Sequence, residues 1–166
     1  MNIELKKWSF EDKKILITIC NGVDRTFLSN RLPFPYTDEA ADWWLDMVKK
    51  HDGADSIIRL IIADGNPVGS ISIEPKNDVY FRDAEIGYML ITDAWSKGIA
   101  SEAVRQICEI AFSKLNIIRI TGYVYEPNTA SRRVLEKNGF KLEGIMEKAV
   151  TKNDKLYNLC IYGKLK

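Results

Sequence analysis

Polar and apolar residues alternate along several short segments of the chain, and this period of two is typical of strands with one buried face. Ile3–Trp8 shows the alternation, and Ile57–Ala63 is rich in β-branched residues. Asp64-Gly65-Asn66-Pro67 is a strong turn signal before a second alternating segment, Val68–Glu74, so the two segments predict a hairpin. Further strands are expected over 84–91, 117–125, 141–150 and 156–164, which gives a sheet of about seven strands.

Apolar positions three and four residues apart predict helices between these strands. The clearest helix lies between Ala100 and Leu115. Thr37 is the expected N-cap of an earlier helix in which Trp43 and Trp44 pack inward, and Gly139 is the expected left-handed cap of a later one. These other helices are expected over 10–21, 38–50 and 128–138. The pattern predicts an α/β (α+β) fold, and the absence of linkers and repeats predicts one domain over residues 1–166.

Charge and cysteine content exclude several classes of protein. The chain has 24 lysines and arginines against 23 acids, a net charge of +1, which argues against binding nucleic acid through released counterions. Cys20, Cys108 and Cys160 lie far apart without a CxxC pair, so we expect neither a disulfide framework nor a metal site. No run approaches the roughly 20 apolar residues that span a membrane, and the first residues do not resemble a signal peptide. We therefore expect a cytoplasmic protein that binds neither nucleic acid nor membrane.

The segment Glu85–Glu102 combines a strand, a short loop and the start of the long helix. The first turn of a helix leaves backbone N–H groups unpaired, and such groups bind phosphate. Small residues at Gly98, Ala100 and Ser101 would let a bulky anion approach, and Lys97 adds a positive charge. Neither GxxxxGK[ST] nor GxGxxG is present, so the usual ATP and dinucleotide loops are not supported. A plain loop that uses glycine to turn is the alternative.

Four segments, in the right order, resemble the GNAT N-acetyltransferases. Residues 95–100, Trp-Ser-Lys-Gly-Ile-Ala, resemble the acyl-CoA pyrophosphate loop [Q/R]-x-x-G-x-[G/A]. Trp95 departs from this pattern, but an aromatic residue is usual there in the branch that modifies ribosomal-protein N-termini. Residues 84–90 resemble the strand before the loop, 128–140 the late helix with N-x-x-S and G-F, and 32–37 the Pro-Tyr segment of that branch. The resemblance implies a mixed sheet that is splayed in the middle, with helices on both faces.

The same resemblance implies acetyl-CoA as co-substrate. Its pantetheine would lie in the wedge of the sheet and pair with the backbone of Met89, Leu90 and Ile91 as an added strand does. Its pyrophosphate would rest on backbone amides of Lys97, Gly98, Ile99, Ala100 and Ser101.

The late helix would supply the remaining contacts to the cofactor. Asn128 and Ser131 would reach the pantetheine and the thioester. Arg132, Arg133 or Lys137 would meet the adenosine phosphate, unless they simply form an exposed basic face.

Two residues are candidates for the proton transfers that acetylation of an amine requires. Glu85 stands at the position of the family's strand glutamate and would act as base through a water, provided that burial raises its pKa; a surface or salt-bridged glutamate is the alternative. Many family members carry a tyrosine four residues before the Gly-Phe pair, where this chain has Leu135. Ser131 is therefore the candidate acid, or else a hydroxyl that hydrogen-bonds the cofactor or the helix backbone.

Phe34, Tyr36 and Trp44 are expected to line the groove for the acceptor, with a hydrophobic plug beneath the loop as the alternative. The expected reaction is direct attack of a primary amine on acetyl-CoA in a ternary complex. The neighbouring segments lack a run of acids for a polycation, which favours a protein N-terminal amine over a polyamine or amino sugar. A non-catalytic acyl-CoA-binding module is the other alternative, and both a monomer and a homodimer are compatible with the sequence.

Overall fold

The structure is a computed structural model that describes all residues from Met1 to Lys166. Its strands form one sheet in the order β1-β2-β3-β4-β5-β7-β6. All neighbours are antiparallel except β4 and β5, which are parallel. The strands are β1 (Ile3–Lys7), β2 (Ile57–Ala63), β3 (Asn66–Pro75), β4 (Asp83–Leu90), β5 (Arg119–Tyr125), β6 (Lys141–Lys152) and β7 (Lys155–Leu165). The mixed seven-stranded sheet that we expected is confirmed.

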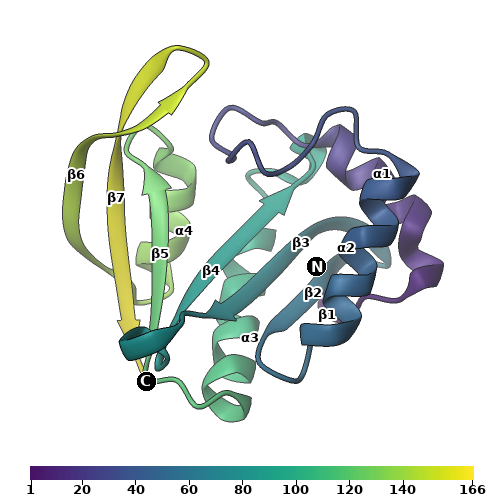
Figure 1. Cartoon of the computed structure of the whole chain (residues 1–166), viewed down its shortest axis with the longest axis horizontal. Helices are drawn as coiled ribbons and strands as arrows, with labels where there is room; N and C mark the ends of the chain where they lie inside the picture. The colour runs from purple at the N-terminus through teal and green to yellow at the C-terminus, as the bar shows by residue number, and fades with distance from the viewer.

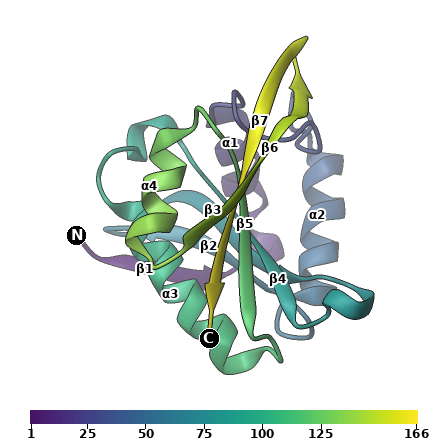
Figure 2. The same cartoon turned by 90° about the vertical axis from the view of Figure 1, so that its left-hand side faces the viewer.

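Helices cover both faces of this sheet (Figure 1; Figure 2). One hydrophobic core contains residues of α3 and α4, and a second contains residues of α1 and α2. Strand β2 supplies both cores, because Ile57 and Ile61 belong to the first while Ile58 and Leu60 belong to the second. The helices are α1 (Lys13–Gly22), α2 (Asp38–His51), α3 (Ile99–Lys114) and α4 (Thr129–Lys137). None of them is long and apolar enough to cross a membrane.

The parallel strands β4 and β5 stay together only at their beginnings. Asp83, Ala84 and Glu85 pair with Arg119, Ile120 and Thr121, and no pairing follows. Beyond these residues the two strands diverge towards their carboxyl ends, as Figure 1 shows. The later part of β4 therefore has a neighbour on the β3 side alone, which opens the expected wedge in the middle of the sheet.

The structure confirms the two helix caps predicted from local residue signals, but it contradicts the predicted packing of Trp43. The Thr37 side chain accepts a hydrogen bond from the Ala40 amide and caps α2, and Gly139 has a φ of 80° just after Asn138, the C-cap of α4, both as predicted. Trp43 was expected to pack inward, but it is 70% exposed because the buried face of α2 follows Ala41, Leu45 and Val48, on the opposite side of the helix.

Several element boundaries also differ from the expectation by one to three residues. The residues Phe10–Asp12 form a separate 3-10 turn, so α1 begins only at Lys13. The hairpin between β6 and β7 turns through Asn153 and Asp154 alone, both with positive φ, so each strand is longer than predicted.

Candidate active site

The loop before α3 presents a row of free backbone N–H groups. Gly98 takes the N-cap position with a φ of 79°, and no side chain caps the helix. None of the N–H groups from Lys97 to Ser101 donates to another group of the chain, and helical bonding begins with the Glu102 amide, 3.1 Å from the Gly98 carbonyl. Ile99 is 3% exposed, so only its backbone faces the loop. The arrangement can hold a phosphate, because the free donors and the helix dipole both attract an anion.

Two side chains that the sequence did not single out as site residues hold this loop in place. The Trp95 indole donates to the Leu90 carbonyl at 3.1 Å and ties the loop to the end of β4. Asn138 follows α4, and its amide donates to the Ser101 carbonyl at 3.1 Å and to the Ser101 hydroxyl at 3.2 Å. The start of α3 is therefore held from both sides of the wedge, by β4 on one side and by the end of α4 on the other.

Strand alternation decides which backbone groups of β4 face the wedge. The Ile91 amide donates to Val68 at 2.9 Å, on the β3 side, and Met89 shares this direction because it lies two residues earlier. The backbone groups of Tyr88 and Leu90 then point to the side that β5 has left. Backbone pairing with a ligand in the wedge is thus a prediction for the N–H of Leu90, whose carbonyl already accepts from Trp95, with Tyr88 as a further position. The expected pairing of Met89 and Ile91 does not fit this alternation, because their backbone groups face β3.

Ser131 lies across the wedge from β4, in the first turn of α4. Its backbone N–H donates to the Asn128 side chain at 3.2 Å, so Asn128 caps the helix. Its hydroxyl lies 2.7 Å from the Tyr88 hydroxyl, which comes across from β4. Burial raises the pKa of Tyr88 to about 12 and keeps the phenol protonated. Sequence reasoning missed Tyr88 as a site residue, although it lies within the strand motif.

Glu85 lies at the point where β4 and β5 part, and it is exposed to solvent. The protein atoms packed around its carboxyl raise its pKa above the ordinary value, while the charges of Arg31 and Lys76 act in the opposite direction. Glu74 stands directly opposite on β3 and supports the increase. A carboxylate whose pKa is raised is a better base than an ordinary glutamate.

The expected acceptor residues lie in different surroundings. Tyr36 is 5% exposed and belongs to the second core, which is the packing role named as the alternative. Phe34 is 70% exposed, with the Arg25 guanidinium 4.8 Å from its ring centre. Trp44 is half-buried and packs edge-on against Trp8 at 5.3 Å between ring centres. Phe34 is the one of the three that is open to a ligand.

The loop between α1 and α2 reaches across to the hairpin of β6 and β7 (Figure 1). Lys152 at the end of β6 donates to the backbone carbonyls of Arg25 and Leu28. The Phe27 ring stands edge-on to Tyr125 at 5.9 Å and to Tyr157 at 6.3 Å between ring centres. We call this set of contacts the loop–hairpin bridge. It joins the loop between α1 and α2 to the carboxyl end of β5 and to the hairpin.

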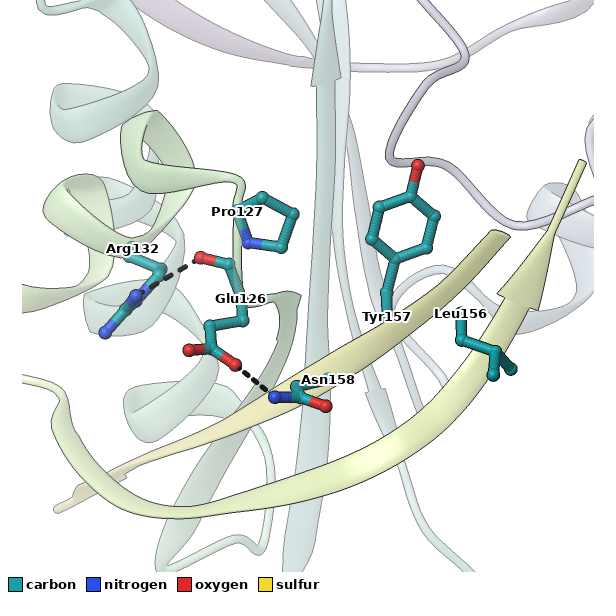
Figure 3. Close-up of a pocket in the computed structure, with 6 residues that line it drawn as sticks. All are labelled: Glu126, Pro127, Arg132, Leu156, Tyr157 and Asn158. Carbon is teal, nitrogen blue, oxygen red and sulfur yellow. Dashed lines mark hydrogen bonds between the residues drawn. The ribbon is translucent and has the colours of Figure 1, made fainter. Parts of the chain in front are cut away.

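A cavity of about 390 Å³ lies beside this bridge and is drawn in Figure 3. The Glu126 carboxylate accepts from the Asn158 amide at 2.6 Å. Arg132 donates to the Glu126 carbonyl at 3.2 Å and to the Tyr162 hydroxyl at 3.0 Å. Arg132 is therefore engaged within the chain, and of the three basic residues considered for the adenosine phosphate, Arg133 and Lys137 stay exposed.

Comparison with known proteins identifies the family. Residues 2–141 match the model of the acetyltransferase (GNAT) domain. Because this match covers most of the chain, the protein belongs to the GNAT acetyltransferases and is an N-acetyltransferase of that type.

The similar proteins include three from bacilli. An uncharacterized N-acetyltransferase, p20 of Bacillus licheniformis, is 28% identical over 99% of this chain and 93% of its own length. YoaA of Bacillus subtilis, also uncharacterized, is 38% identical over 51% of this chain. The putative ribosomal N-acetyltransferase YdaF of the same organism is 33% identical over 64% of this chain. The matched segments span 48% of YoaA and 57% of YdaF, about half of each relative.

Among solved structures, a ribosomal L7/L12 alpha-N-protein acetyltransferase, RimL, in complex with coenzyme A has a TM-score of 0.87. The alignment covers 99% of this chain and 94% of that one at 19% identity, so it shows the shared fold.

Proposed function

We propose that this protein transfers the acetyl group of acetyl-CoA to the α-amino group of a protein N-terminus. The observation that carries the proposal is the row of free N–H groups before α3, placed beside a wedge that opens the sheet. A pyrophosphate fits the first feature and an extended pantetheine arm fits the second. The coenzyme A complex of RimL, which has the same fold, supports this choice of cofactor.

Acetyl transfer in this site needs positioning and proton transfers rather than a covalent intermediate. Glu85 takes a proton from the incoming ammonium, directly or through a water, and its raised pKa suits that role. Ser131 donates a proton to the sulfur that leaves. Leu135 is 1% exposed and has no proton to give, so the tyrosine acid of many family members is replaced here.

The charges near Glu85 favour an acceptor with a single cationic amine. Glu85 and Glu74 stand opposite each other on β4 and β3, which suits one ammonium group. Arg31 and Lys76 lie close enough to Glu85 to influence its carboxyl, and they would repel a second positive charge. A peptide N-terminus satisfies this pattern better than a polyamine does. The name of YdaF, a putative ribosomal N-acetyltransferase, points in the same direction.

An assay of free CoA release tests the proposal. The acceptors are peptides with free Ser or Ala N-termini, the same peptides with blocked N-termini but a free lysine, spermidine, glucosamine and free amino acids. We expect release only with free N-termini. Faster release with a small amine would move the assignment to a small-molecule acetyltransferase. Binding of acetyl-CoA without release for any acceptor would indicate a non-catalytic acyl-CoA-binding module.

A further inference from the structure

The Tyr88 side chain links β4 to α4 across the wedge. It lies on β4, and its hydroxyl is 2.7 Å from the Ser131 hydroxyl and 3.2 Å from the Ser131 carbonyl on α4. Its ring packs against the core beneath α3 and α4. The phenol is thus a half-buried polar group whose hydrogen-bond partners in the chain all belong to Ser131.

Ser131 and Leu135 are four residues apart in α4 and therefore share one face of the helix. Leu135 fills the space against β5 so closely that a Cβ built on Gly122 would lie 2.8 Å from the leucine side chain. This face of α4 offers a serine hydroxyl and a hydrocarbon side chain. A phenol reaches the same face from β4 instead.

A serine hydroxyl alone is a poor acid for a thiolate, because it is a much weaker acid than a thiol. A second group that donates a hydrogen bond to the serine oxygen offsets this weak acidity, because it neutralises the negative charge that develops when the serine proton leaves. Tyr88 carries one proton, which it can give to the Ser131 hydroxyl or to the carbonyl. Donation to the hydroxyl leaves the serine proton free to point at the sulfur.

We propose that Tyr88 is a positioning residue that orients the Ser131 hydroxyl and returns a proton to it during acetyl transfer. This inference rests on the proposed function. As the C–S bond of the tetrahedral intermediate breaks, the Ser131 proton passes to the sulfur and the Tyr88 proton passes to the serine oxygen. Water then reprotonates the phenolate. The amine nitrogen forms the new C–N bond, and its protons leave through Glu85 to solvent, so one proton is released per turnover.

The experiment compares five proteins in the free-CoA assay: wild type, Tyr88→Phe, Ser131→Ala, the double variant, and Tyr80→Phe as control. Phenylalanine keeps the ring of Tyr88 and removes only the hydroxyl. Tyr80 is 64% exposed in the turn before β4, so its variant removes the same atom far from α4. The measurements are kcat, KM for acetyl-CoA, the calorimetric Kd for acetyl-CoA and the melting temperature.

We expect Tyr88→Phe to lower kcat by about tenfold to a hundredfold while KM and Kd for acetyl-CoA stay within about twofold. The double variant should lose no more activity than Ser131→Ala alone, because both hydroxyls act on one proton. Tyr80→Phe should match wild type.

Three results would overturn the inference. The first is unchanged kcat in Tyr88→Phe, and the second is a loss that appears in Kd and melting temperature, which would make the contact a structural link. The third is a double variant whose loss equals the product of the single losses. A wild type that binds acetyl-CoA yet acetylates no amine would instead refute the proposed function.

Discussion

At the scale of single residues, Glu85 gains its chemical character from its place in the sheet. It is the last residue of β4 that pairs with β5, and it stands exposed at the base of the wedge, where neighbouring protein atoms partly shield its carboxyl from water. Those surroundings raise its pKa, and Glu74 on the neighbouring strand adds to the effect. A glutamate at this position of a fully paired sheet would lack the opening beside it.

The first prediction concerns Glu85 as a base. Glu85→Gln keeps the shape of the side chain and removes its basicity, so kcat/KM should fall by about a hundredfold or more. In the wild type, kcat/KM should rise with pH as the carboxyl ionises, and this rise should lie above the ordinary glutamate pKa because the pKa of Glu85 is raised. The variant should lack that rise. An unchanged pH profile in Glu85→Gln would exclude the residue as the base.

The same raised pKa has a consequence for stability. A folded-state pKa above the unfolded value means that the ionised carboxylate is disfavoured by folding. The protonated carboxyl therefore stabilises the folded state at pH values below the pKa of the unfolded chain. This stabilisation is lost as the pH rises through the pKa of the folded protein. Glutamine never ionises, so the melting temperature of Glu85→Gln relative to wild type should increase from about pH 4 to about pH 8. A constant difference would argue against a raised pKa.

At the scale of elements, the start of α3 depends on the left-handed conformation of Gly98. An alanine at this φ costs about 1 kcal/mol, and its methyl group would project into the open space beside the loop, where a bound pyrophosphate would approach. We expect Gly98→Ala to weaken CoA binding by about tenfold or more in calorimetry, with little effect on pantetheine, which has no phosphates.

Gly53 provides a matched control for this variant. Its φ is 82°, a Cβ there would meet no atom within 4 Å, and it lies in the turn after α2. Gly53→Ala should carry a similar strain and leave the Kd for CoA unchanged. Equal losses of CoA affinity in the two variants would show that Gly98 acts only through stability.

A separate prediction concerns the loop–hairpin bridge. Lys152→Met removes the donor to the carbonyls of Arg25 and Leu28 and frees the loop between α1 and α2. KM for the acceptor should rise several-fold while the Kd for acetyl-CoA stays the same, because the hydrogen bonds of the bridge do not involve the loop before α3. Lys155→Met changes an exposed lysine of the same hairpin and should behave as wild type. A loss of acetyl-CoA affinity in Lys152→Met would contradict this division of roles.

At the scale of the whole molecule, two halves of the sheet meet at both ends of the wedge. Three residue pairs join β4 to β5 at one end. At the other end the loop–hairpin bridge joins the loop between α1 and α2 to β5 and to the hairpin of β6 and β7. The opening between these contacts is where the cofactor and the acceptor are proposed to meet.

Much of this architecture was predictable because its signals are local. The limits of β2, the cap at Thr37 and the left-handed Gly139 follow from residue types within a few positions. The loop before α3 was predicted in the same way, together with the family resemblance, whereas Glu85 was predicted as a base from the resemblance alone.

The contacts that complete the site were not predictable, since they join residues far apart in sequence. Tyr88 and Ser131 are 43 positions apart, and Lys152 and Arg25 are 127 apart. Residue type also failed to fix which face of α2 is buried, and so Trp43 was misplaced. Tyr36 could not be assigned between groove and core, because an aromatic residue after proline suits either place.

The central claim is that the free amides before α3 bind the pyrophosphate of coenzyme A. The most direct test is a calorimetric titration of the folded wild-type protein with CoA, and then with pantetheine at the same concentrations. The account predicts saturable binding of CoA that is at least tenfold tighter than binding of pantetheine. Equal affinities for the two ligands, or no heat with CoA, would contradict it.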